Sequence, residues 1–149
     1  AMVLQEVADM RERISIAKTP VGTLDVKIGP GRLLDVELVS QAGAVLAGLP
    51  ATDVASGLRG AVAIGWLDDA DLTALNQVYD LCWRVQVAAM LVSEHPLEVS
   101  GMGQAGRDFL LRITGVRDVD SLQSRLVDLA RQAADRIAKA LPAHREDGR

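Results

Sequence analysis

The side chains best suited to chemistry are two acids and an amide in one short segment, Asp35, Glu37 and Gln41. Two carboxylates must converge to hold one metal or share one proton. Residues two apart on a helix point about 200° away from each other, so Asp35 and Glu37 cannot converge. We expect Asp35 on the buried face, bonded to backbone N–H groups at the helix start. The same face would hold Leu34, Leu38, Ala42 and Val45.

Glu37 and Gln41 are one helical turn apart, and they share the face opposite Asp35. A solvated polar face explains this pair, because exposed helix faces are ordinarily polar. An interface with another domain explains it equally well. The residues alone leave both interpretations open.

A turn rich in glycine precedes these acids, in the stretch Lys27-Ile28-Gly29-Pro30-Gly31-Arg32. Gly29 and Gly31 let backbone approach a ligand closely, and a following helix would present unpaired N–H groups. Lys27 and Arg32 would add positive charge. The combination is compatible with a phosphate-binding turn, and also with a plain turn that carries a solvated lysine.

Other motifs have structural explanations. Residues 101–106 match G-x-G-x-x-G, but no strand precedes them, so we interpret them as a connector. Asp69-Ala70-Asp71 and Asp118-Val119-Asp120 match D-x-D, and we interpret both as helix caps. His95 and His144 have no partner at metal-ligand spacing, and Cys82 fits a buried core thiol. No complete active site is visible.

Composition narrows the class of protein. The chain has 149 residues, 49% of them hydrophobic, and a net charge of −4, which argues against nucleic acid or an anionic membrane as the main partner. A single cysteine excludes an internal disulfide and a cysteine-ligated zinc. No stretch is long enough to span a membrane, and no secretory signal opens the chain. We therefore expect a cytoplasmic location.

Apolar spacing, caps and breakers predict an all-α fold, a bundle of five to six mostly antiparallel helices. The bundle would be a single domain over 1–142, with 1–2 as a cloning remnant and 143–149 as a disordered polar tail. Helices are expected near 3–18, 32–47, 53–65, 68–93, 107–114 and 118–141, with 21–28 extended or a short strand. The expected buried stripes include Val7, Met10, Ile14 and Ile16 in the first helix, and Tyr79, Cys82, Trp83 and Met90 in the longest.

The stretch Lys27 to Gln41, KIGPGRLLDVELVSQ, resembles the K-x-G-P-G-G-L-x-D-I-E-F-x-x-Q segment of glutamine synthetase adenylyltransferase. In that family the segment follows each nucleotidyltransferase domain and begins its helical bundle. Gly65 to Asp71, Tyr79 to Gln86, and Gly115 to Leu141 are similar to later parts of the same bundle. The likeness covers most of the chain.

Departures from the family pattern indicate which part of that enzyme the chain resembles. Arg32 replaces the second glycine, and Leu38 replaces a phenylalanine. Gln86-Val87-Ala88 stands where the deadenylylating half carries Glu-His-Arg, which favours the carboxy-terminal, adenylylating half. The family's catalytic carboxylates precede the bundle, and nothing in this sequence matches their motif. We expect no catalytic residue in this chain, which by itself would be inactive and bind no cofactor.

The resemblance implies transfer of AMP from ATP, with Mg²⁺, to a tyrosine of glutamine synthetase, which regulates nitrogen assimilation. The expected partners are the enzyme's own nucleotidyltransferase domain, glutamine synthetase and a nitrogen-status signalling protein. Lys27, Gly29, Gly31 and Arg32 would lie near the triphosphate, while Asp35, Glu37 and Gln41 would lie in the same region, the last two facing the catalytic domain. Two alternatives stay open: a helical module of a uridylyltransferase-type enzyme, and a free-standing interaction domain.

Overall fold

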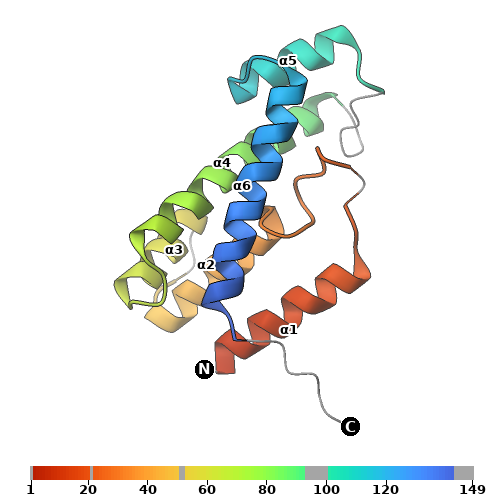
Figure 1. Ribbon diagram of the computed structural model, residues 1–149. Coiled ribbons are helices and arrows are strands. Elements are labelled where there is room, and N and C mark those ends of the chain that lie inside the picture. Colours follow the sequence, from red (N-terminus) through yellow and green to blue (C-terminus); the bar gives the residue numbers. More distant parts are fainter. Residues whose placement is uncertain (1, 21, 51–52, 93–100, 143–149) are drawn as a thin grey trace.

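The computed structural model describes residues 2–20, 22–50, 53–92 and 101–142, and this part of the chain is an all-α helical bundle (Figure 1). Six helices follow one another, and no strand occurs among the described residues. Their bounds are α1 Met2–Ala17, α2 Leu33–Ala47, α3 Val54–Ala63, α4 Asp69–Val92, α5 Gln104–Thr114 and α6 Val119–Ala140. None of these helices has the length and apolar character needed to cross a bilayer.

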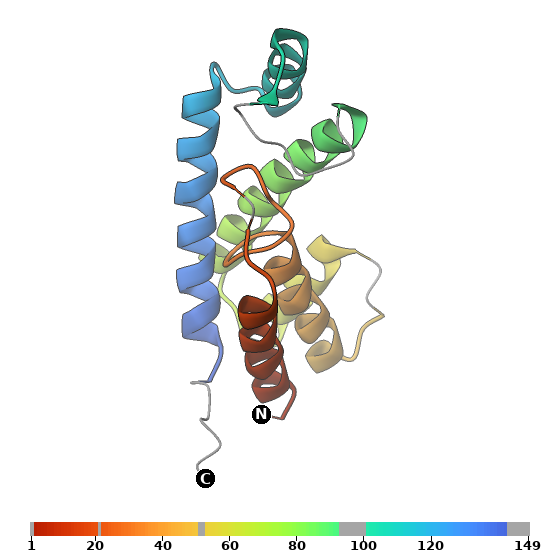
Figure 2. The ribbon, with the colours of Figure 1, turned by 90° about the vertical axis from the view of Figure 1, so that its right-hand side faces the viewer.

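The long helices α4 and α6 pack against each other and run antiparallel, because the start of α4 contacts the end of α6; α6 lies along one side of the bundle (Figure 2). The short helix α5 covers the far ends of both, and α1 lies at the opposite end (Figure 1). Leucine, valine and alanine side chains from every layer form one continuous core around Leu75, Val78 and Val85 of α4. Cys82 lies fully buried in this core, as predicted.

Helices α2 and α3 pack unusually closely, because small residues line both sides of their contact. A Cβ added to Gly43 would lie 2.5 Å from the carbonyl oxygen of Gly57. A Cβ added to Gly57 would lie 2.2 Å from Oγ of Ser40. Ser40 also donates a hydrogen bond of 2.8 Å to the carbonyl of Val54 at the start of α3. The glycines at this contact are therefore explained by the close approach of the two helices.

Local signals place most helix ends correctly. Asp53 caps α3 by accepting a hydrogen bond from the backbone N–H of Ser56, and Asp118 caps α6 in the same way through Ser121. Gly48 and Gly115 end α2 and α5 in the left-handed conformation that glycine favours. The connector expected over 101–106 is wrong in its second half, because α5 already begins at Gln104. Residues 143–149, predicted to be a tail, lie outside the described residues.

Two expectations about helix faces are wrong. The predicted stripe of α1 is wrong at Met10 and Ile16, which are exposed, although Val7 does pack partly buried against the core; the buried residue of α1 is Ala8. On α2, Val45 is 63% exposed and the buried face instead follows Val36, Val39 and Gly43. The reason is that α2 is apolar nearly all round, so its close contact with α3 decides which side is covered.

The segment expected to be extended or a short strand makes turns and bends over its described residues 22–28. Its alternating pattern still has a structural meaning, because Leu24 and Val26 point into the core. The loop from residue 22 to residue 32 passes beside α6 (Figure 2), and Gln123 of α6 donates a 2.7 Å hydrogen bond to Oγ1 of Thr23. No neighbouring strand is within reach of this loop in the described part of the chain, since helices surround it.

Candidate functional site

Asp35 is an internal structural acid. Asp35 is only 6% exposed. Its carboxylate accepts a 2.7 Å hydrogen bond from the backbone N–H of Gly31, as predicted for an acid at a helix start. The sequence did not indicate its second partner. Arg11 of α1 donates to both carboxylate oxygens, through Nε and, at 2.9 Å, through Nη2. Asp35 therefore joins α1, the turn and α2, and its oxygens are occupied within the fold.

The glycines of the turn bring backbone against α6. Gly31 has a φ of +72° and is buried, and a Cβ there would lie 2.0 Å from the carbonyl oxygen of Ala130. Gly29 has a φ of +124°, next to the ring of Pro20. Both positions need glycine for reasons internal to the fold.

The donors expected to hold a phosphate chain are used within the protein. At the start of α2, the N–H groups of Leu33 and Leu34 donate to the carbonyls of Val26 and Lys27, at 3.0 and 3.1 Å. Arg32 is buried, and its Nη1 donates to the carbonyls of Thr23 and Asp25, at 2.9 and 2.6 Å.

The turn therefore does not fit the triphosphate of ATP, and we assign it no step in nucleotide chemistry. Of the two cations expected there, Lys27 is exposed and Arg32 supports the loop. Within the described ranges, no group of three histidine, cysteine or acidic side chains is arranged to hold a metal ion. His95 and His144 lie outside the described residues.

Glu37 and Gln41 lie on a different side of α2 from Asp35, with Glu37 half-buried and Gln41 exposed. Tyr79 of α4 lies close enough to feel the charge of Glu37. The pKa of Tyr79 is raised, first by its partial burial and then by the negative charge of Glu37. Glu37 is thus within electrostatic range of Tyr79 on the neighbouring helix, which the sequence alone did not indicate.

Trp83 follows Tyr79 by one turn of α4, and its large indole is 48% exposed. The prediction that Trp83 and Met90 belong to the buried stripe is wrong, since Met90 is exposed too. On a helical wheel Trp83 lies about 60° from Asp80, which is exposed and pairs with the exposed Arg84 at 3.0 Å. We call Glu37, Gln41, Tyr79 and Trp83 the α2–α4 surface. This set holds an acid, an amide and two aromatic side chains on two neighbouring helices, each of them partly or largely uncovered among the described residues.

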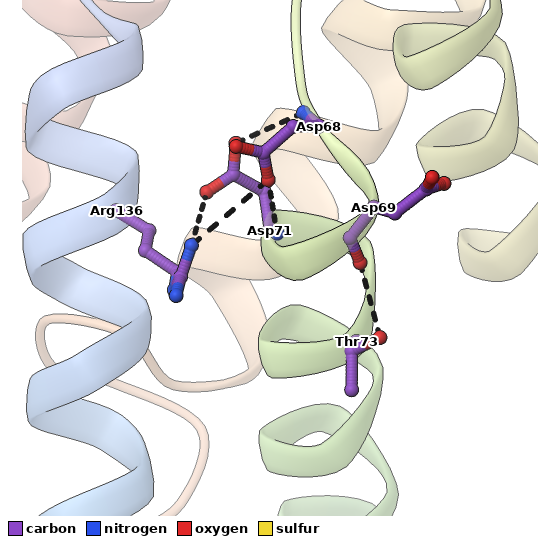
Figure 3. Close-up of polar contacts among 5 residues, drawn as sticks. All are labelled: Asp68, Asp69, Asp71, Thr73 and Arg136. Atoms are coloured by element: carbon purple, nitrogen blue, oxygen red, sulfur yellow. Dashed lines mark hydrogen bonds and ion pairs between the residues drawn. The ribbon is translucent and has the colours of Figure 1, made fainter.

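The first D-x-D sequence belongs to a helix cap, as predicted, but only its Asp71 takes part, together with the preceding Asp68 (Figure 3). The backbone N–H of Asp71 donates to Oδ1 of Asp68 at 2.7 Å, and the N–H of Asp68 donates back to Oδ2 of Asp71 at 3.1 Å. Arg136 of α6 donates to Oδ1 of Asp71 at 2.9 Å. Asp69 points away from this cluster, while Oγ1 of Thr73 donates to its backbone carbonyl. The cluster therefore fastens α4 to α6.

These contacts change the ionisation of Asp71. Burial by itself would raise its pKa, but the backbone N–H of Asp68 and the guanidinium of Arg136 outweigh burial, so the pKa lies below its usual value of 3.8. Arg136 is 65 residues away in sequence. The sequence alone could not indicate Arg136 as the partner of Asp71, because the two meet only through the antiparallel packing of α4 and α6.

Comparison with known proteins does not identify a family for this chain. No family model, no curated protein and no solved structure matches the chain. The α2–α4 surface is therefore the feature from which function has to be argued, together with the resemblance carried by residues 27–41.

Proposed function

We propose that this chain is the helical domain that follows the catalytic domain in the adenylylating half of glutamine synthetase adenylyltransferase. Its role is to pack on that nucleotidyltransferase domain through the α2–α4 surface. The observation that carries the proposal is that Gln41 is exposed and Glu37 half-buried on α2, with a half-exposed tryptophan on the adjacent helix. These two residues match the acid and the amide of the family segment.

Within residues 27–41, some residues are explained by contacts inside the fold and others are not, which supports this proposal. Gly31 and Asp35 are turned inward, where they join the loop to α6 and to α1. The fold itself accounts for these two residues, whereas Gln41 is exposed and Glu37 is only half-buried, within electrostatic range of Tyr79 on α4. A tryptophan and a tyrosine beside an acid and an amide form the kind of surface that protein partners cover, because aromatic residues dominate interface energies.

The chemistry of the proposed enzyme would come from the preceding domain, which would hold ATP and Mg²⁺ and transfer AMP to a tyrosine of glutamine synthetase. This chain would pack against that domain as a helical neighbour. Lys27 is the exposed cation of the turn and is the residue by which this domain would contact an anionic partner. Glutamine synthetase and a nitrogen-status signalling protein would then be partners of the whole enzyme.

The first test is to sequence the coding DNA upstream of this chain, over about 200 codons, which is the length of a typical domain. The proposal expects a strand, a Gly-Ser turn with D-x-D, and a third acid further on. The longer protein should then adenylylate glutamine synthetase with ATP and Mg²⁺. A start codon next to Met2 would overturn the proposal and leave a free-standing interaction domain. A longer protein that transfers UMP instead would identify the uridylyltransferase alternative.

A further inference from the structure

A cavity of about 560 Å³ lies between α1, the loop after it, the start of α2 and the end of α6. Its walls are mainly aliphatic, and they include Ile14, Leu34, Leu38 and Leu141. Cavities of this size and character commonly hold small molecules. None of the four residues of the α2–α4 surface lines this cavity, so a ligand bound there would be independent of the proposed function.

Positive charge lies on the α1 side of this cavity. Arg11 uses Nε and Nη2 to hold Asp35, which leaves its Nη1 without a partner among the described residues. Lys18 also lines the cavity, and its side chain is exposed. Two cationic donors therefore border an apolar hollow.

The acids that line the cavity differ in what they could do to an incoming anion. Asp35 is buried, and both of its oxygens already accept hydrogen bonds, so its charge is compensated. Glu12 is exposed and lines the same cavity, where it would weaken the binding of an anion. Because Lys18 and Glu12 carry opposite charges at the same cavity, removing each charge in turn tests whether the ligand is an anion.

We propose that this cavity binds a small amphipathic carboxylate, such as a medium-chain fatty acid. Its hydrocarbon body lies against Leu34, Leu38 and Ile14, where it is removed from water. Its carboxylate accepts charge-assisted hydrogen bonds from Lys18 and from Nη1 of Arg11. The ligand leaves the Arg11–Asp35 ion pair in place.

The test is calorimetric titration of decanoate, below its micellar concentration, into the whole chain. We expect saturable binding that Lys18→Gln weakens about tenfold, the usual worth of a charge-assisted hydrogen bond. Glu12→Gln should tighten binding about two- to threefold. The matched control Lys139→Gln removes the same charge at a different hollow and should leave the affinity unchanged.

Two further measurements separate a carboxylate site from a merely apolar one. Decanol, which has the same hydrocarbon body, should bind about tenfold more weakly than decanoate. Leu38→Phe places a bulkier ring in the cavity and should weaken binding, while thermal melting confirms that this variant is folded. Absence of saturable binding, equal affinity for decanol and decanoate, or unchanged binding by a folded Leu38→Phe variant would each overturn the proposal.

Discussion

Arg11 of α1 and Asp35 of α2 form a bidentate ion pair that crosses 24 positions of sequence. The carboxylate is buried and also accepts the N–H of Gly31, while the guanidinium is partly accessible. This pair connects α1 to the rest of the bundle, because α1 buries few apolar side chains and Ala8 is the one buried residue among its described positions. The stability of α1 should therefore depend on this contact to an unusual degree.

Arg11→Ala should destabilise the chain by about 3 kcal/mol, because it leaves a buried carboxylate with part of its compensation removed. The measurement is the free energy of unfolding from urea denaturation. Arg131→Ala is the control, since it breaks the exposed Arg131–Asp128 pair, and such pairs contribute about 0–1 kcal/mol. Similar small losses in both variants would show that the Arg11–Asp35 pair does not hold α1.

Gly57→Ala should destabilise the chain by about 3 kcal/mol or more, since overpacking against backbone forces two helices apart. The added Cβ would meet the carbonyl oxygen of Ser40 at 2.3 Å as well as its Oγ. Gly22→Ala is the control, because nothing lies within 4 Å of its added Cβ. Thermal melting of both variants tests the close contact of α2 and α3. Equal melting temperatures would mean that the helices separate at little cost.

The boundaries of the helices could be predicted because their signals are local. Asp53 and Asp118 each need only the N–H three residues ahead, and Gly48 and Gly115 need only a left-handed backbone. The exposed side of α2 could not be predicted in full. Its burial depends on Gly57 of another helix, and an almost wholly apolar sequence has no periodicity from which to choose a face.

The candidate site was predictable to a similar degree. The angular separation of Asp35 and Glu37 follows from helix geometry, and the structure places them on different sides as expected. The partners of these acids, Arg11 and Tyr79, come from other helices and depend on tertiary packing. For the same reason, the N–H groups expected to be free at the start of α2 are occupied by carbonyls of the preceding loop.

The free energy of unfolding should fall in acid partly because of Asp71. Its pKa is lowered in the folded state, so its stabilising contribution is present above its unfolded pKa, near 3.8, and is lost as pH falls through the lower folded value. Asp71→Asn should therefore be less stable than the parent at pH 7, with the difference shrinking below about pH 4. Asp69→Asn, which removes a charge from the same turn but no contact to α6, is the control. Urea denaturation from about pH 7 to pH 2 measures both, and a difference independent of pH would contradict the prediction.

Cys82 should be unreactive in the folded chain. Burial raises the pKa of its thiol to about 12, although the positive charge of Arg32 acts in the opposite direction. Because the thiolate is the nucleophile, both low access and low ionisation suppress its reaction. Near pH 8 a disulfide reagent should label the native chain roughly a hundredfold more slowly than the urea-unfolded chain. Comparable rates in the two states would show that the core around α4 opens readily.

Glu37→Ala should change the free energy of unfolding of this chain by less than about 0.5 kcal/mol, because Glu37 is only half-buried. In the proposed longer enzyme the same change should lower the rate of adenylylation, and Trp83→Ala should weaken domain packing by about tenfold or more. Denaturation of the isolated chain and activity of the longer protein separate the two effects. Gln132→Ala, on α6 away from the α2–α4 surface, is a control expected to affect neither. A loss of several kcal/mol in the isolated Glu37→Ala chain would instead identify Glu37 as a structural acid.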